Sequence, residues 1–278
     1  MRFTKMQGLG NDYVYLDCTQ GMPPDPPKLA RTMSDRHFGV GSDGLICIRR
    51  SERADFRMSM YNADGSEGEM CGNGIRCLGK FVYDRGLTDK TELTVETLAG
   101  VKRLSLHGKD GAVDSLSVDM GAPILDLERI PVTGSGDRFV SRRLTVQGRA
   151  WEVTCLSMGN PHAVLFVEDL SRVDVPSLGP AVERHAVFPN HVNAEFVQVL
   201  GRDRLRMRVW ERGTGETLAC GTGACAALCA GVLTDRTGRR ADVELPGGTL
   251  SIRWEEADGH VYMTGPAVTV FQGEWPEA

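Results

Sequence analysis

The feature that most constrains the fold of this chain is an internal repeat. Residues 71–74 read Cys-Gly-Asn-Gly, and residues 220–223 read Cys-Gly-Thr-Gly, 149 positions later. The pair Gly-Asn at 10–11 recurs with the same spacing at 159–160. Repeats of this length are domains rather than the roughly 20–50-residue units of solenoids. We therefore predict two domains of similar fold, each carrying one copy of the cysteine segment.

Each copy combines many short strands with one central helix. Apolar, β-branched and aromatic runs such as 13–17 and 163–167 follow glycine-containing turns and predict strands. A small, apolar stretch after each Cys-Gly-x-Gly turn predicts a helix that begins at the cysteine. Further helices are expected near residues 27–37 and 178–185. Because the two copies follow one another without a low-complexity linker, we expect them to pack closely.

Composition and charge exclude several classes of protein. The 278 residues are 41% hydrophobic, enough for a substantial core, and the net charge of -5 argues against a nucleic-acid partner. The alternating residues Arg202, Arg204, Arg206 and Arg208 favour the solvent face of a strand over a phosphate-binding stripe. No run approaches the roughly 18 apolar residues of a membrane span, so we expect no membrane association.

The cysteines indicate a reducing compartment. The chain has eight of them, and its first residues lack the apolar core of a signal peptide, so reduced thiols and a cytoplasmic location are expected. Metal binding is not predicted, because no Cys-x-x-Cys pair is present. The cysteines outside the two repeated turns are expected to be small core residues, namely Cys18, Cys47, Cys77, Cys155, Cys225 and Cys229.

A cysteine at the start of a helix is placed to become a thiolate. The first N–H groups of a helix have no intrahelical acceptor and lie at the positive end of its dipole, so they favour an anion. The same groups can hold a carboxylate. Two such thiols on opposite sides of one carboxylate-bearing carbon suggest inversion by two bases, in which one removes the α-proton and the other returns a proton.

No cofactor is predicted for this reaction. Pyridoxal phosphate would be bound through a lysine, and no lysine lies in a repeated glycine-rich segment. The developing carbanion would instead be stabilised by oriented N–H dipoles in a closed, dry pocket. Two helix N-termini could supply those dipoles.

Eight segments of the chain occur in the order of one known family, namely residues 10–13, 39–44, 61–66, 70–77, 158–162, 193–196, 210–217 and 219–223. On these segments the chain resembles the diaminopimelate epimerase family, nearly from end to end. The resemblance implies conversion of LL-2,6-diaminopimelate to the meso form, without a cofactor, on the route to lysine and peptidoglycan. It implies an α+β fold of two pseudo-symmetric domains, each a β-barrel-like sheet around a central helix, and a homodimer. We place the half with Cys71 at residues 1–117 plus 264–278, and the half with Cys220 at 118–263.

The family's functional residues transfer onto this chain position by position. The resemblance implies that Cys71 and Cys220 are the acid and base. The backbone amides that would hold the reacting carboxylate are those of Gly72, Asn73, Gly221 and Thr222. The distal carboxylate would meet the guanidinium of Arg212, and this end would be completed by Asn62, Asn160 and Asn193. Glu211 would lie near the reacting ammonium, and His162 with Glu211 would set the charge state of the two thiols. Asn11 would be a further contact with the substrate. Phe271 would contact a second subunit.

One position departs from a common version of the family pattern. Several members have a glutamine that reaches the substrate where this chain has Gly44. Backbone or water could take over that contact. The repeat partner of Gly44 is Asn193, which retains an amide.

Three other functions compete with this interpretation. A proline or hydroxyproline racemase would share the architecture, but its substrate would leave Glu211 and Arg212 without a partner. A thiol hydrolase or redox protein would need only one of the two cysteines. A binding module without catalysis gives no reason for two reactive thiols.

Overall fold

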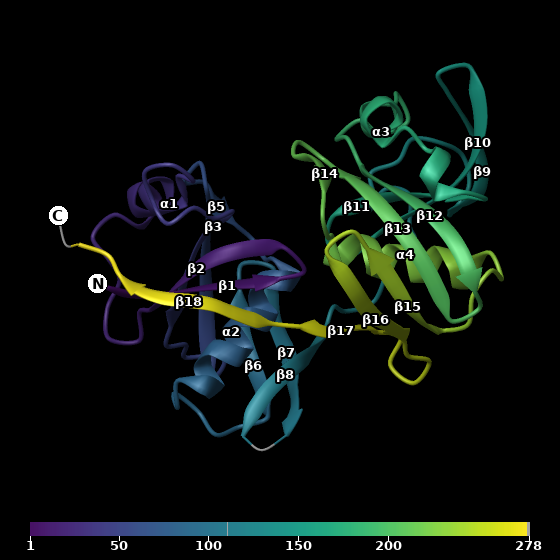
Figure 1. Ribbon diagram of the computed structural model, residues 1–278. Coiled ribbons are helices and arrows are strands. Elements are labelled where there is room, and N and C mark those ends of the chain that lie inside the picture. The colour runs from purple at the N-terminus through teal and green to yellow at the C-terminus, as the bar shows by residue number, and fades with distance from the viewer. Residues whose placement is uncertain (110, 277–278) are drawn as a thin grey trace. The chain divides into compact units, whose positions relative to one another are not determined.

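The computed structural model describes residues 1–109 and 111–276 and divides into two compact units, Met1–Val118 with Thr264–Ala278, and Asp119–Met263. Each unit is a mixed sheet with two α-helices, and the elements of both are labelled in Figure 1. The predicted α+β class and the repeated order of elements are confirmed. Within the described ranges, no helix is long and apolar enough to cross a membrane.

The first unit is built on β1 (Arg2–Gly8), which pairs antiparallel with both β2 (Asn11–Asp17) and β18 (Val268–Glu274). β2 runs parallel to β3 (Gly44–Arg49), and β3 is antiparallel to β4 (Phe56–Asn62). β4 then pairs antiparallel with β5 (Glu67–Gly68) and parallel with β6 (Glu92–Thr97). The antiparallel strands β7 (Gly100–Lys109) and β8 (Ala112–Asp119) complete the sheet.

The central helix of this unit is α2 (Gly72–Asp84), which packs against β1, β2 and β7. Its buried face includes Ile75, Leu78 and Phe81. A Cβ on Gly79 would lie 2.5 Å from Leu116 Cδ2, so glycine lets the helix approach β8 closely. The buried Arg76 fixes the helix start, because its guanidinium donates to Asn73 Oδ1 at 2.8 Å and to the Pro266 carbonyl at 3.2 Å.

The second unit repeats this topology, with β9 (Phe139–Val146) in the place of β18. The strands β9, β10 (Arg149–Ser157) and β11 (Pro161–Val167) are antiparallel neighbours, and β11 runs parallel to β12 (Asn193–Gly201). β13 (Arg204–Glu211) pairs with β12, β14 (Gly215–Thr217) and, in parallel, β15 (Arg240–Leu245). β16 (Gly248–Trp254) follows β15, and β17 (Val261–Pro266) crosses into the first unit's part of the chain.

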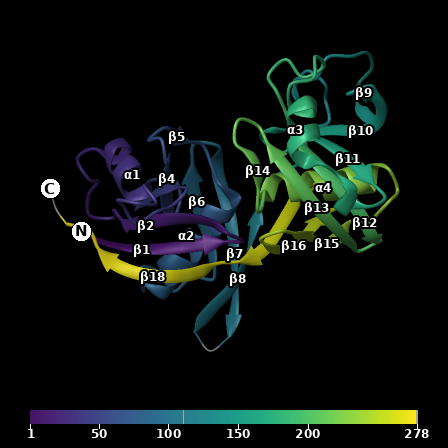
Figure 2. The ribbon, with the colours of Figure 1, turned by 45° about the horizontal axis from the view of Figure 1, so that its top comes forward.

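The central helix of the second unit is α4 (Gly221–Leu233), and sheet strands surround it (Figure 2). It contacts β10, β11, β12, β13, β15 and β16. A helix that is apolar on every side must be buried on every side, and ten of its thirteen residues are buried. Its alanines, cysteines and glycines are small enough to fit inside this strand layer. The prediction that Cys225 and Cys229 are core residues is confirmed, since both are fully buried.

The remaining cysteine predictions and most of the arginine predictions are also confirmed. All eight cysteines are free thiols, and those predicted for the core are buried, namely Cys18, Cys47, Cys77 and Cys155. On β13, the exposed Arg204 and Arg206 meet Glu244 at 3.1 and 2.8 Å, and the half-buried Arg208 meets Glu216 at 2.7 Å. Arg202 is exposed but lies in the turn before this strand, so the strand prediction is wrong for that residue. The three arginines of β13 therefore form a surface ion-pair network.

Two predicted helix boundaries were wrong. The helix expected at 27–37 is α1 (Pro26–Ser34), which ends early because the Asp35 side chain accepts hydrogen bonds from the backbone N–H groups of His37 and Phe38, both at 2.8 Å. The helix expected at 178–185 is α3 (Val175–Glu183). It begins three residues earlier, because the side chain of Asp174 caps the N–H of Ser177.

Candidate active site

Both repeated cysteines are the capping residues of their helices. Cys71 precedes α2 with φ and ψ of -125° and 120°, and Cys220 precedes α4 with -121° and 112°. Each sulfur accepts a hydrogen bond from the third residue after it, at 3.4 Å from Gly74 N and from Gly223 N. The first-turn amides of Gly72, Asn73, Gly221 and Thr222 therefore lie beside a sulfur in each unit. The two thiols have the same local geometry, at the helix ends that favour anions.

Asn11 connects Cys71 to a cluster of charges. Its Oδ1 accepts the thiol hydrogen at an Oδ1–Sγ distance of 3.1 Å, while its Nδ2 donates to Asp43 Oδ2 at 2.8 Å. The guanidinium of Arg36 bridges Asp43 and Asp12, with both contacts at 2.9 Å. Asp43 therefore fixes the direction of the Asn11 amide and leaves its oxygen at the sulfur.

Tyr13 is a neighbour of Cys71 that the sequence analysis missed. Its ring is 5% exposed, and its hydroxyl lies within hydrogen-bonding reach of Cys71 and Asn11. Burial and the adjacent Cys71 sulfur raise the pKa of Tyr13 well above its usual range, so the phenol stays protonated. The signal for Tyr13 was present in the repeat, because the spacing that pairs Asn11 with Asn160 also pairs Tyr13 with His162.

Gly44 lies directly opposite Tyr13 in the parallel β2–β3 pairing. A Cβ on Gly44 would lie 2.2 Å from the Tyr61 carbonyl oxygen and 2.8 Å from Tyr13 Cε1. The ring of Tyr13 therefore occupies space that a side chain at position 44 would need. Any contact of Gly44 with a ligand is limited to its backbone.

Cys220 lies in a buried environment with two carboxylates nearby. Its pKa is well above the usual range, first because burial disfavours the thiolate and then because the carboxylates of Glu211 and Glu195 repel negative charge. Thr222 Oγ1 lies 3.5 Å from the sulfur. Glu211 itself accepts a short hydrogen bond from the Thr217 hydroxyl. These surroundings disfavour the thiolate form of Cys220.

His162 forms a buried chain of contacts near Cys220. Its Nδ1 lies 2.7 Å from Glu195 Oε1, and its Nε2 lies 3.0 Å from Asn160 Oδ1. His162 and Glu195 are both fully buried. Burial raises the pKa of Glu195, and the adjacent His162 opposes this. Glu195 belongs to a segment that carried the family resemblance, but no role was predicted for it.

The structure gives Asn193 a role in holding the backbone. Its Nδ2 donates to the Pro161 carbonyl at 2.9 Å, and its Oδ1 accepts the Arg212 N–H at 2.9 Å. The guanidinium of Arg212 is exposed and donates to the Asn190 carbonyl at 3.1 Å. Asn193 thus fixes the position from which Arg212 extends.

The other predicted residues fall near these groups or apart from them. Asn62 lies opposite Gly44 on β4 and donates to Ser66 Oγ at 2.9 Å. The Asn73 side chain is buried against Arg76, so only its backbone could meet a ligand. Phe271 lies on β18, is 44% exposed and makes an edge contact with Phe3 at 5.9 Å between ring centroids. In the described ranges, no group of three or more metal-binding side chains is present.

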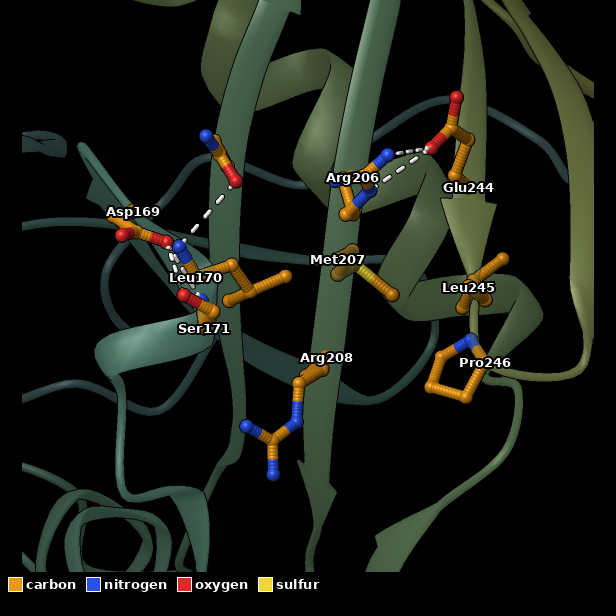
Figure 3. Close-up of a pocket in the computed structure, with 10 residues that line it drawn as sticks. Asp169, Leu170, Ser171, Arg206, Met207, Arg208, Glu244, Leu245 and Pro246 are labelled. Atoms are coloured by element: carbon orange, nitrogen blue, oxygen red, sulfur yellow. Dashed lines mark hydrogen bonds and ion pairs between the residues drawn. The ribbon is translucent and has the colours of Figure 1, made fainter.

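A cavity of about 490 Å³ in the second unit contains none of the predicted site residues. Its lining includes Leu170, Met207 and Pro246, with Arg206 held by Glu244 at its edge (Figure 3). The Asp169 and Ser171 side chains on the opposite rim are bonded to each other. Its arginines are already paired, so this cavity offers no free charge for a ligand.

Comparison with solved structures defines the class of fold. A probable proline racemase from Agrobacterium radiobacter has a TM-score of 0.73 at 15% identity, with 99% of this chain and 92% of that chain covered. A phenazine biosynthesis protein of the PhzF family from Bacillus anthracis has a TM-score of 0.71 at 17% identity, with 100% and 99% covered. At such low identity these matches establish the fold alone, and this chain shares that fold with both proteins.

Sequence comparison gives the family. The sequence model of the diaminopimelate epimerase family matches residues 3–125 and 154–270. The diaminopimelate epimerase of Acetivibrio thermocellus is 56% identical over 274 residues, with 99% of this chain and 98% of the relative covered. That of Desulfovibrio desulfuricans is 56% identical over 281 residues, with 99% and 98% covered. The chain belongs to the diaminopimelate epimerase family.

Proposed function

We propose that this chain is an isomerase that converts LL-2,6-diaminopimelate to meso-diaminopimelate without a cofactor, with Cys71 and Cys220 as its acid and base. The observation that carries the proposal is the pair of cysteines that cap α2 and α4 with nearly the same backbone geometry. Family membership supplies the substrate, since the relatives are named for it.

The proposed proton transfers balance without any other reactant. Cys71 reacts as the thiolate, the form that has lost the hydrogen donated to Asn11 Oδ1 in the thiol form. The thiolate takes the α-proton of the LL substrate and becomes a thiol, while the Cys220 thiol gives its proton to the opposite face and becomes a thiolate. The reverse direction exchanges these roles. The elevated pKa of Cys220 supports this order for the free protein, because it keeps the donor protonated.

The carboxylate at the reacting carbon would be held by the first-turn amides of α2 and α4, from Gly72, Asn73, Gly221 and Thr222. These N–H groups stabilise the negative charge that develops as the proton leaves, and their orientation is fixed in advance by the helices. Glu211 would accept from the reacting ammonium group. At the distal end, Arg212 would pair with the second carboxylate through two parallel N–H bonds.

The experiment is turnover in deuterated water. LL-diaminopimelate should gain deuterium at one α-carbon and become the meso isomer, and Cys71→Ala or Cys220→Ala should each abolish this conversion. A thiol hydrolase or redox protein would survive the loss of one of the two cysteines. Exchange with proline in place of diaminopimelate would refute the assignment and favour a proline-type racemase, the second candidate.

We also propose a cytoplasmic homodimer. Strand β18 exposes Val268, Val270 and Phe271, and adjacent exposed apolar side chains of this kind are typical of contacts between subunits. The free state of all eight cysteines supports a reducing compartment. Each half of the chain, 1–117 plus 264–278 and 118–263, would contribute one thiol.

A further inference from the structure

Glu195 carries a buried carboxylate whose only part in the proposed mechanism is its negative charge near Cys220. It lies on β12, is fully buried and places Oε1 at 2.7 Å from His162 Nδ1. Its other oxygen, Oε2, has no hydrogen-bond partner. A buried carboxylate with one oxygen unsatisfied is costly. Its retention in the core of this unit therefore calls for a role beyond packing.

The contacts of His162 determine which of its nitrogens carry hydrogen. An amide oxygen can only accept, so His162 Nε2, at 3.0 Å from Asn160 Oδ1, donates its N–H to that oxygen. The other nitrogen, Nδ1, shares a proton with Glu195 Oε1. Because the Asn160 Oδ1 accepts the hydrogen bond from His162, the –NH2 group of the same amide points away from the imidazole.

The first unit shows that the fold does not require an acid at position 195. The repeat register pairs Glu195 with Ile46, and His162 with Tyr13. Both positions lie under the first turn of a central helix, since a Cβ on Gly74 would lie 2.8 Å from Ile46 Cδ1 and one on Gly223 would lie 2.9 Å from Glu195 Oε1. The same site in the same topology is thus filled by an aliphatic side chain in one unit and by a carboxylate in the other.

The equivalent asparagines have opposite orientations. In the first unit Asp43 takes the amide nitrogen of Asn11 and leaves its oxygen for the Cys71 thiol. In the second unit His162 takes the amide oxygen of Asn160 and leaves its nitrogen. An –NH2 group is the end of an amide that can donate to a carboxylate of the substrate.

We propose that Glu195 is a positioning residue that, through His162, holds the Asn160 amide with its –NH2 group toward a carboxylate of the substrate. This inference rests on the proposed function, which supplies the carboxylate. Without Glu195, the imidazole is free to carry its hydrogen on Nδ1 alone. Nε2 then becomes an acceptor, the Asn160 amide turns to donate to it, and its oxygen faces the carboxylate and repels it.

Two substitutions at position 195 separate positioning from packing. Glu195→Ile copies the residue of the first unit and removes the partner of His162 Nδ1. Glu195→Gln keeps a hydrogen-bond partner for His162 Nδ1, because the glutamine N–H can donate to Nδ1 and so preserve the hydrogen on Nε2. We expect Glu195→Ile to raise KM about 10-fold or more above the KM of Glu195→Gln, the effect of losing one hydrogen bond to a charged group. Both variants remove the carboxylate charge near Cys220, so a change in kcat from that loss is common to both. Glu195→Gln should stay within about 3-fold of the wild-type KM.

A double-mutant cycle tests whether Glu195 acts through Asn160. If it does, Glu195→Ile adds no further rise in KM to an Asn160→Ala protein, because the amide that it orients is already absent. Multiplicative effects of the two substitutions on KM would overturn the proposal. So would a wild-type KM in Glu195→Ile.

A substrate-free measurement separates this inference from the proposed function. Nitrogen NMR of labelled protein should show hydrogen on His162 Nε2 in the wild type and in Glu195→Gln, and a shift toward Nδ1 in Glu195→Ile. Wild-type protein with hydrogen on Nδ1 alone would overturn the inference without any variant, even if Glu195→Ile does not fold. Failure of the wild type to convert LL-diaminopimelate would refute the proposed function instead, while the NMR result still decides the link between Glu195 and His162.

Discussion

Replacing Asn193 by alanine should damage both the stability of the second unit and the use of substrate. Asn193 is 3% exposed, and its amide makes two hydrogen bonds to backbone groups of different segments, the Pro161 carbonyl and the Arg212 N–H. A hydrogen bond is worth about 1 kcal/mol net, and a buried group left unpaired costs roughly 1–3 kcal/mol. Since both partners lose their bond, Asn193→Ala should lower the free energy of unfolding by about 2–4 kcal/mol.

The effect on substrate should pass through Arg212. Loss of the Asn193 contact frees the backbone from which this guanidinium extends, so KM for diaminopimelate should rise about 10-fold while kcat changes less. Urea unfolding followed by circular dichroism measures the first effect, and steady-state kinetics measure the second. Asn62→Ala is the matched control for the stability measurement. Among the described residues, the Asn62 amide donates to the Ser66 side chain at 2.9 Å and holds no backbone group, so this substitution should cost less than about 1 kcal/mol of stability.

Two results would refute this reasoning. An unfolding free energy of Asn193→Ala within about 0.5 kcal/mol of the wild type would show that the two backbone bonds contribute little. The combination of Asn193→Ala with Arg212→Met tests the coupling. If the two effects on KM multiply, Asn193 meets the substrate independently of Arg212, as the sequence alone predicted.

Three further predictions concern the first unit. Tyr13→Phe should shift the pH dependence of Cys71 alkylation by iodoacetamide about one pH unit upward, because a hydrogen-bond donor that favours the thiolate is lost. Peptide mass spectrometry measures the alkylation at each pH, and an unchanged pH dependence contradicts the prediction. Burial raises the pKa of Asp12, but hydrogen bonds from Arg36 and Lys5 outweigh the effect of burial and hold the pKa of Asp12 below its ordinary value of 3.8. Stability from Asp12 is therefore present above pH 3.8 and lost as pH falls through the lower folded-state pKa, so Asp12→Asn should flatten the acid limb of the urea midpoint. Gly44→Ala should cost about 1–3 kcal/mol, because its methyl would meet a β4 carbonyl at 2.2 Å; an unchanged urea midpoint would show that β3 moves freely.

Local features of the sequence predicted the parts of the structure that depend on neighbouring residues. The Cys-Gly-x-Gly segments begin helices because the capping residue and the first helical turn are adjacent in the chain. The arginines of β13 alternate because strand side chains alternate, a period of two residues that is visible in the sequence. The end of α1 was missed because it depends on one side chain, Asp35, which competes for the backbone.

Contacts between strands could not be predicted in the same way. Tyr13 is important because it lies opposite Gly44 and beside Cys71, which is 58 residues later in the chain. Glu195 matters because the parallel pairing of β11 and β12 places it beside the strand that carries His162. Neither contact has a local signature. The repeat register holds the clue, since a residue given a role in one half has a partner in the other, and comparing all such pairs would have singled out both.

The opposite orientations of Asn11 and Asn160 bear on how a duplicated protein diverges. A comparison of the two halves by residue type would count these asparagines as unchanged, yet one presents an oxygen and the other a nitrogen. The difference in amide orientation is set by the neighbouring residue, an aspartate in one half and a histidine in the other. The same residue type can thus present opposite chemistry in the two halves of one chain, and differences in function between such halves should be sought one contact away from the residues that look most alike.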